Sequence, residues 1–309
     1  MRWHILGAGA IGCLFAERLT RAGIAVTLLL RDEAQLDRLN QRGCQVRVQR
    51  DNAWHTAQVD AEPISASGDI QHLLVTTKAY DSIDAINAIS PRLTPDAQIL
   101  LLQNGYGHQQ KSAAALFPRP VWAGITTSGA RRTAAFEVIQ SGEGQTLVGR
   151  LNPPADAGAR YPDGWDRLDH PVQISRDINH ALWQKLAINA AINPLTALHG
   201  CRNGELLGAE YSDELTALCS EIERVAAACA QPLFDTPLLE QVRQVATNTA
   251  HNRSSMLEDL RSGRRTEIEQ ITGFLCAAAR EVGVETPLNT RLLNAVRFEQ
   301  SLNTREEPV

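Results

Sequence analysis

A lysine and two asparagines recur at every fourth position within one apolar stretch of the chain. They are Lys185, Asn189 and Asn193, and their neighbours are mostly leucine, isoleucine and alanine. Four-residue spacing places the three side chains along one face of a helix. An ammonium group in such surroundings loses hydration, which lowers its pKa and suits it to transfer a proton near neutral pH. The stripe therefore predicts a site that binds a polar ligand and moves a proton.

A purely structural interpretation of the same stripe is open as well. Lys185 could lay its aliphatic stem across apolar neighbours while its ammonium reaches water, and nearby loops could satisfy both amides. The stripe alone does not separate the two interpretations. Other segments must provide the fold that positions these residues and a second reactant for them.

The first thirty residues carry the pattern of a dinucleotide-binding βαβ unit. A short apolar strand over 3–6 leads directly into a glycine-rich turn, a helix runs to about residue 21, and a second apolar strand covers 25–30. In this pattern the first glycine makes a tight turn, the second admits a pyrophosphate, and the third lets the helix pack closely on the sheet. We expect the helix N-terminus to hold the dinucleotide through Gly7, Ala8, Gly9, Ala10, Ile11 and Gly12.

The residue that follows the second strand bears on the choice between NADP and NAD. An arginine there favours the 2′-phosphate of NADP, whereas an acidic residue accepts hydrogen bonds from the free ribose hydroxyl of NAD. The chain has Arg31 at this point and Asp32 directly after it. We favour NADP(H), while NAD stays open if the strand ends one residue later. The structural alternative for Arg31 is a solvated charge at a strand end.

Further strands and helices continue a doubly wound pattern. Strands are predicted over 72–78, 97–103 and 121–126, with a helix over about 81–90. Lys78 and Asn104 stand where two of these strands end, at the edge where open α/β sheets bind ligands. Small residues up to Ala130 follow the third strand and would let a nicotinamide ring lie against backbone.

The second half of the chain is predicted to be helical. A Pro- and Gly-rich loop over 151–164 and a short strand over 171–174 precede long helical segments near 178–192, 209–230, 237–262 and 266–282. The predicted fold is an α/β Rossmann-type N-terminal domain over 1–174, followed by an all-α C-terminal domain over 175–309 that carries substrate and catalytic groups.

Composition excludes several classes of protein. The 309 residues are 43% hydrophobic and have a formal net charge of −5, which favours neither disorder nor nucleic-acid binding. No apolar run approaches the ~20 residues of a membrane span. Six cysteines without a CxxC pair and eight histidines without HExxH spacing predict neither a disulfide scaffold nor a metal site. We expect a cytoplasmic protein, and the sequence leaves open whether it is a monomer or a dimer.

Seven segments together resemble the ketopantoate reductase, or 2-dehydropantoate 2-reductase, family: GAGAIG, TTKAY, LQNGYG, LWQKLAINAAINPLTAL, CRNGEL, SSML and RRTEIEQITGF. They span almost the whole chain. The glycine pattern is common to many dehydrogenases, whereas Lys-x3-Asn-x3-Asn-Pro followed by Asn-Gly-Glu-Leu and Thr-Glu-Ile is far more specific. The resemblance implies NADPH-dependent reduction of 2-dehydropantoate to pantoate, toward pantothenate and coenzyme A. It also implies a C-terminal domain like that of 6-phosphogluconate dehydrogenase.

The resemblance also implies roles for individual residues. Lys185 matches the general acid that protonates the ketone oxygen, and Glu267 matches a glutamate near the substrate hydroxyl and the cofactor. Asn104 matches a position between cofactor and substrate. The positions that match cofactor contacts are Arg31, Lys78 and Ala130, and those that match substrate contacts are Asn189, Asn193, Asn203 and Ser255.

Two competing functions keep the same fold. One is an NAD(P)-dependent reductase of another small 2-oxo acid, with the same lysine and a reshaped pocket, since a few methylenes change selectivity only modestly. The other is a noncatalytic NADPH-binding sensor, because a fold does not fix a function. A sensor needs no proton donor, so the joint presence of Lys185, Glu267 and the amides weighs against it.

Overall fold

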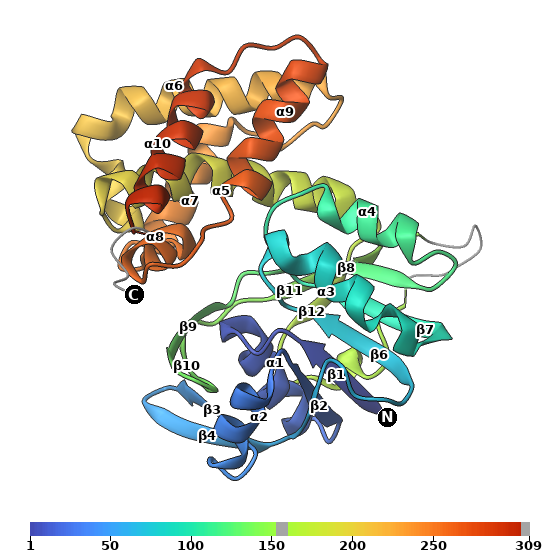
Figure 1. The fold of residues 1–309 in the computed structure, drawn as a ribbon. Helices are drawn as coiled ribbons and strands as arrows, with labels where there is room; N and C mark the ends of the chain where they lie inside the picture. Colours follow the sequence, from blue (N-terminus) through green and yellow to red (C-terminus); the bar gives the residue numbers. More distant parts are fainter. Residues whose placement is uncertain (153–159, 304–309) are drawn as a thin grey trace. The chain divides into compact units, whose positions relative to one another are not determined.

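The computed structural model describes residues 1–152 and 160–303, and Figure 1 shows its fold. Half of the loop predicted over 151–164, residues 153–159, therefore lies outside the described residues. Two compact units make up the chain. Unit 1 contains Met1–Gln103 and His108–Ile178, and unit 2 contains Asn104–Gly107 together with the chain from Asn179 onward. An α/β unit and a helical unit are the fold class that the sequence predicts, which is confirmed.

An eight-stranded sheet forms the centre of unit 1. Its strands are β1 (Arg2–Leu6), β2 (Ala25–Leu30), β5 (Asp60–Pro63), β6 (Ile70–Val75), β7 (Leu93–Leu101), β8 (Val121–Thr126), β11 (Thr146–Arg150) and β12 (Val172–Ile174). They lie in the order β12-β11-β8-β7-β6-β1-β2-β5, and β11 runs antiparallel to β8. Because β1 lies between β2 and β6, the winding direction reverses at β1 and β6. Ligands bind beyond the carboxyl ends of strands at such a switch point.

Successive residues of the central strands enter separate cores on the two faces of this sheet, as strand geometry requires. Ile5 packs in one core and Leu6 in the other, and Leu28 and Leu29 divide in the same way. Helix α1 (Ala10–Arg21) contributes to the first core, while α3 (Ser82–Ile89) and α4 (His108–Ala115) contribute to the second. Burial on both faces explains why these strands read as nearly continuous apolar runs.

A second sheet of four strands was not predicted from the sequence. It has the order β4-β3-β10-β9, formed by β4 (Ala53–Gln58), β3 (Gln45–Arg50), β10 (Glu137–Gly142) and β9 (Gly129–Ala134). Val46, Val48 and Val138 are fully buried and share a core with α1. The small sheet therefore covers α1, the helix that follows the glycine-rich turn.

Six α-helices, one 3-10 turn and one π-helical turn form the described part of unit 2, seen in yellow to red in Figure 1. They are α5 (Ile178–His199), a 3-10 turn (Asn203–Leu207), α6 (Ala209–Ala228), α7 (Leu238–Asn248), α8 (Ser255–Arg261), a π-helical turn (Glu269–Gly273), α9 (Phe274–Glu281) and α10 (Pro287–Asn303). The segment predicted as one helix over 237–262 is two helices with a break over 249–254. The sequence did not predict α10.

Helix α5 continues beyond its predicted end near residue 192. It includes Pro194, which has no N–H and removes one helical hydrogen bond. Leu195 and Ala197, after the proline, are buried in the core of unit 2. Burial of this apolar face outweighs the missing hydrogen bond, so the helix runs to His199.

Glu221 is a buried acid that holds the start of α10. Its carboxylate accepts hydrogen bonds from the backbone N–H of Leu288 at 2.9 Å, and from the backbone N–H and side-chain amide of Asn289 at 3.0 and 2.9 Å. We expect Glu221→Ala to lower the free energy of unfolding by about 2–3 kcal/mol, because these buried donors lose their acceptor. Urea denaturation measures the change. Arg224→Ala, at an exposed position one turn later, is the control and should change stability by less than ~0.5 kcal/mol. Equal midpoints for the two variants would contradict this role of Glu221.

Candidate active site

The three glycines of the first turn have different surroundings. Gly7 has φ +110°, and a Cβ there would lie 2.5 Å from the backbone nitrogen of Thr77. A Cβ on Gly12 would lie 2.0 Å from the carbonyl oxygen of Gly7. A Cβ on Gly9 would meet no atom within 4 Å. The protein itself therefore requires Gly7 and Gly12, whereas the space beside Gly9 fits the close approach of a ligand.

The glycine-rich turn and the N-terminus of α1 together have the features of an anion-binding site. Gly9 is the N-cap of α1 and has no side chain with which to cap it, so among the described residues the first-turn N–H groups of Ala10, Ile11 and Gly12 lack the usual N-cap side chain. Thr76 donates a hydrogen bond to the carbonyl oxygen of Gly7 at 2.6 Å and joins the ends of β1 and β6. These residues fit the pyrophosphate of a dinucleotide.

Arg31 and Asp32 differ in their surroundings. Arg31 directly follows β2 and is exposed. Asp32 is the N-cap of α2 (Glu33–Asn40), and its carboxylate accepts a hydrogen bond from the backbone N–H of Gln35 at 2.8 Å. A helix cap accounts for Asp32 without a ribose ligand, which favours Arg31 as the residue that faces a cofactor.

Lys78 and Ala130 lie in different parts of unit 1. Lys78 follows the end of β6 and precedes a 3-10 turn, Ala79–Asp81, beside the switch point. Ala130 belongs to β9 of the small sheet, opposite Gln140, and packs against the core that contains α1. Ser128, just before β9, accepts a hydrogen bond at 3.1 Å from the buried guanidinium of Arg18. This arginine, which the sequence did not single out, anchors the segment that leads to Ala130.

Lys185 lies on α5 and is partly buried. Loss of hydration lowers the pKa of its ammonium group to about 8, and the carboxylate of Glu267 opposes this by favouring the charged form. An amine with a pKa near 8 is largely protonated at neutral pH and still gives up its proton readily. The chemistry that the sequence predicts for Lys185 thus has a physical basis in unit 2.

Glu267 is a buried carboxylate with defined neighbours. It is 5% exposed, and its Oε2 accepts a hydrogen bond from the amide of Asn104 at 3.2 Å. Its backbone carbonyl accepts hydrogen bonds from Gln270 and Ile271, both at 3.1 Å, where the chain enters the π-helical turn. Such turns are rare and often occur at functional sites. Glu269, two residues later, pairs instead with Arg297.

Asn104 reaches Glu267 because the Asn104–Gly107 segment is fixed to the helices of unit 2. Gly105 has φ +83°, and a Cβ there would lie 2.6 Å from the carbonyl oxygen of Gln270. The same carbonyl accepts the backbone N–H of Tyr106 at 3.1 Å. The Tyr106 ring packs against Trp183 and Phe274, with ring centroids 5.4 and 5.0 Å apart. The sequence pattern assigns no role to this tyrosine, although an aromatic residue between two glycines is a usable signal.

The four residues predicted to contact substrate all belong to unit 2. Asn189 is partly buried on α5, Asn193 is buried one turn later, and Asn203 is the buried first residue of the 3-10 turn. Ser255 is exposed and begins α8. The chain segments beside two of them meet, because the hydroxyl of buried Thr196, three residues after Asn193, lies 2.7 Å from the hydroxyl of Ser254, which precedes Ser255.

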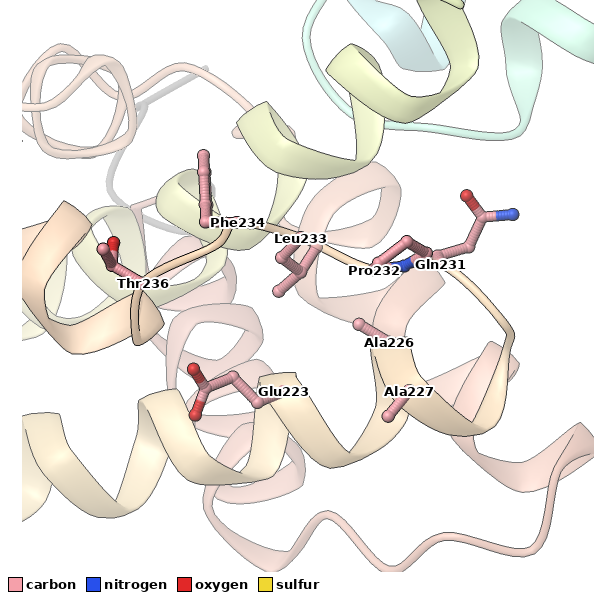
Figure 2. A pocket seen from close by; sticks show the side chains of 8 residues that line it. All are labelled: Glu223, Ala226, Ala227, Gln231, Pro232, Leu233, Phe234 and Thr236. Carbon is pink, nitrogen blue, oxygen red and sulfur yellow. The ribbon is translucent and has the colours of Figure 1, made fainter.

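A pocket elsewhere in unit 2 contains none of the predicted site residues. Figure 2 shows that α6 and the segment after it line this pocket, through Glu223, Ala226, Ala227, Gln231, Pro232, Leu233, Phe234 and Thr236. Glu223 already accepts the backbone N–H of Leu238 at 2.6 Å and thereby caps α7. Within residues 1–152 and 160–303, no three histidine, cysteine or acidic side chains gather as a metal site requires. None of the described helices is long and apolar enough to cross a membrane.

Comparison with protein families covers both units. The ketopantoate reductase PanE/ApbA family matches residues 3–153, and the family of its C-terminal part matches residues 177–300. The 2-dehydropantoate 2-reductase of Vibrio cholerae is 36% identical, over 96% of this chain and 97% of the relative. That of Archaeoglobus fulgidus is 33% identical, over 97% and 98%.

Comparison with solved structures gives the same fold. A PanE/ApbA family ketopantoate reductase from Ralstonia eutropha is 26% identical with a TM-score of 0.87, over 98% of this chain and 100% of that chain. D-mandelate dehydrogenase with NADH and anilino(oxo)acetate reaches a TM-score of 0.90 at 20% identity, with the same coverage. At this identity the second match shows the fold alone.

The two glycines at the start of α1 should respond oppositely to an added methyl group. Gly12→Ala is expected to lower the free energy of unfolding by about 1–3 kcal/mol, because its Cβ clashes with backbone. Gly9→Ala should leave stability within ~0.5 kcal/mol but weaken the binding of a nicotinamide dinucleotide, with NADPH as the probe, roughly tenfold or more, about 1.4 kcal/mol. Thermal unfolding and NADPH fluorescence titration measure the two effects. Unchanged NADPH affinity in Gly9→Ala would refute the assignment of this turn.

The pKa of Lys185 predicts a pH dependence. If Lys185 donates a proton during ketone reduction, only its protonated form is active, so kcat/KM should fall about tenfold per pH unit above about 8. Oxidation of the alcohol needs the neutral amine and should rise through the same pH range. Steady-state rates from pH 6 to 10 test this. Lys185→Arg, whose guanidinium stays protonated, should lose the break near pH 8, and a break that persists in this variant would assign it to another group.

Proposed function

The chain belongs to the ketopantoate reductase PanE/ApbA family, and on this premise we propose that it reduces 2-dehydropantoate to pantoate with NADPH. The observation that carries the proposal is the lysine with a lowered pKa, Lys185, electrostatically coupled to the buried carboxylate of Glu267. A protein that only binds NADPH has no use for this arrangement. The family places the reaction in pantothenate biosynthesis.

Reduction of a ketone requires a hydride at its carbon and a proton at its oxygen. The cofactor, held by the glycine-rich turn and α1, supplies the hydride when bound. Lys185 supplies the proton, and its positive charge stabilises the negative charge that develops on the ketone oxygen. General acid catalysis of this kind contributes roughly 10²–10⁴-fold to the rate.

Glu267 and Asn104 support the lysine in this proposal. The carboxylate keeps the ammonium form populated at neutral pH, although burial disfavours it. The hydrogen bond from Asn104 fixes one carboxylate oxygen at 3.2 Å and limits the orientations of the acid. Asn189, Asn193, Asn203 and Ser255 would hold the hydroxyl and carboxylate of the substrate, since amides and hydroxyls both donate and accept hydrogen bonds.

NADPH is the proposed cofactor because exposed Arg31 follows β2 while Asp32 caps α2. Lys78 at the switch point and Ala130 on β9 are proposed cofactor contacts. The cytoplasm is the proposed location, since the cofactor and the pathway operate there.

The second candidate function is reduction of another small 2-oxo acid. D-mandelate dehydrogenase, whose structure was solved with NADH and anilino(oxo)acetate, has the same fold with a TM-score of 0.90. Fold and proton donor would be the same in both functions, so the substrate and the cofactor preference distinguish them. The two candidates differ in whether a hydroxyl on the substrate is needed.

The proposal predicts a selective activity that depends on Lys185. Purified protein should oxidise NADPH faster with 2-dehydropantoate than with pyruvate, 2-oxobutanoate or phenylglyoxylate, and faster than it oxidises NADH. Lys185→Ala should lower kcat by ~10²–10⁴-fold, because the proton donor is lost. Absorbance at 340 nm follows turnover, and NADPH fluorescence shows that the variant still binds cofactor.

The outcomes separate the candidate functions. Preference for a different 2-oxo acid, with the same loss in Lys185→Ala, would replace the substrate and keep the mechanism. Tight NADPH binding without turnover of any 2-oxo acid would establish the sensor. Full activity in Lys185→Ala would remove the lysine from the mechanism.

A further inference from the structure

The amide of Asn203 is buried and satisfied on one side only. The side chain is 8% exposed, and its Nδ2 donates a hydrogen bond to the hydroxyl oxygen of Thr249 at 2.9 Å. Its Oδ1 is buried and accepts no hydrogen bond from the residues that the structure describes. An amide oxygen buried without a donor costs about 1–3 kcal/mol, so such an atom points to a ligand that supplies the donor.

Thr249 determines which atom of the Asn203 side-chain amide, Nδ2 or Oδ1, faces it. Its hydroxyl donates a hydrogen bond to the carbonyl oxygen of Val245 at 2.7 Å. A hydroxyl has one proton, and this one is used. If Oδ1 of Asn203 faced Thr249 instead, one of the two short oxygen-to-oxygen contacts would contain no hydrogen. Nδ2 must therefore face Thr249, and Oδ1 must face away from it.

The backbone holds Asn203 and Thr249 in this arrangement. The N–H of Asn203 donates to the carbonyl oxygen of Asn252 at 3.0 Å, and the N–H of Gly204 donates to that of Ala250 at 3.2 Å. A Cβ on Gly204 would lie 2.6 Å from the Cβ of Ala250, so only glycine permits this approach. The Thr249 backbone is held as well, since its N–H bonds to the carbonyl oxygen of Val245 at 3.0 Å.

The same break between α7 and α8 connects to the helix that carries Lys185. Ser254 caps α8 and lies 2.7 Å from the hydroxyl of Thr196 on α5. The same hydroxyl of Thr196 also lies 2.9 Å from the carbonyl oxygen of Ile192 and 3.1 Å from that of Asn193. Asn203 is thus hydrogen-bonded to the segment between α7 and α8, and the Ser254 end of that segment contacts α5, the helix that carries Asn189 and Asn193.

We propose that Thr249 is a positioning residue that orients the Asn203 amide so that its oxygen accepts a hydrogen bond from a donor group on the substrate. This inference rests on the proposed function and deepens it. A fixed acceptor selects a hydroxyl group and disfavours a carboxylate at this point, because two oxygens without a proton repel each other. Among 2-oxo acids, the site then selects those that carry a hydroxyl, and the carboxylate binds elsewhere.

A pair of substrates that differ in this hydroxyl alone tests the inference. 2-Dehydropantoate has it, and 3,3-dimethyl-2-oxobutanoate is the same acid without it. A site built to bond a hydroxyl rejects the analogue that lacks it by a large factor, up to ~10⁴–10⁵-fold in the strongest cases. We expect the wild type to prefer 2-dehydropantoate in kcat/KM by at least ~10²-fold.

Thr249→Val should lower kcat/KM for 2-dehydropantoate by ~10–100-fold, mainly through KM, since the Asn203 amide is no longer held in one orientation. For 3,3-dimethyl-2-oxobutanoate the change should stay below about threefold. Thr249→Ser keeps the hydroxyl and should restore the preference. Thermal unfolding and NADPH titration show whether each variant is folded, and Thr249→Ser preserves the test if the valine variant is not.

A double-mutant cycle with Asn203→Ala isolates the pair. Thr249→Val should add almost nothing in the Asn203→Ala background, because the group that it positions is absent. Equal losses of Thr249→Val with both substrates, or a full additional loss in the Asn203→Ala background, would make Thr249 merely structural and overturn the inference. If the wild type reduces neither substrate, the proposed function fails first and this inference falls with it.

Discussion

The proposed mechanism depends on one electrostatic balance, between the burial of the Lys185 ammonium and the nearby carboxylate of Glu267. Burial alone would favour the neutral amine, which cannot donate a proton to a ketone. The carboxylate opposes this shift, so the pKa settles at about 8. The balance requires Glu267 to stay buried, and the hydrogen bond from Asn104 is one contact that holds its carboxylate.

The Asn104–Gly107 segment shows how the requirement is met. It follows a strand of unit 1 in the sequence, yet it is attached to unit 2. A left-handed glycine, one backbone hydrogen bond to Gln270 and the packing of Tyr106 hold it there. Asn104 can then donate to Glu267. The attachment depends on close backbone contact, which substitutions at Gly105 would disturb first.

Much of the fold followed from local patterns, and the rest depended on contacts between distant residues. Continuous apolar strands and the glycine-rich turn predicted β1, α1, β2, β6, β7 and β8. The small sheet was not predicted because its strands are half polar; in β3, for example, Val46 and Val48 alternate with arginine and glutamine. The predicted helix end near residue 192 was wrong, because core packing of Leu195 and Ala197 carries α5 past Pro194. The break at 249–254 was unforeseen, because it depends on hydrogen bonds from Asn203, which is distant in the sequence. For the site, helical spacing suggested Lys185 and two asparagines, but no spacing relates Thr249 to Asn203, 46 residues away. Burial and pairing of that kind become visible only in three dimensions.

The small sheet has a consequence for how the chain folds during synthesis. β3 and β4 form a local hairpin, but the face with Val46 and Val48 is completed by β10, which pairs in parallel with β3 and begins at Glu137. A ribosome must therefore add nearly ninety further residues, from Arg50 to Glu137, before α1 acquires its full cover. Pairing across such a separation is slow because the loop must close first. The nascent chain thus carries an unpaired strand edge on this hairpin for several seconds at ~5–20 residues per second.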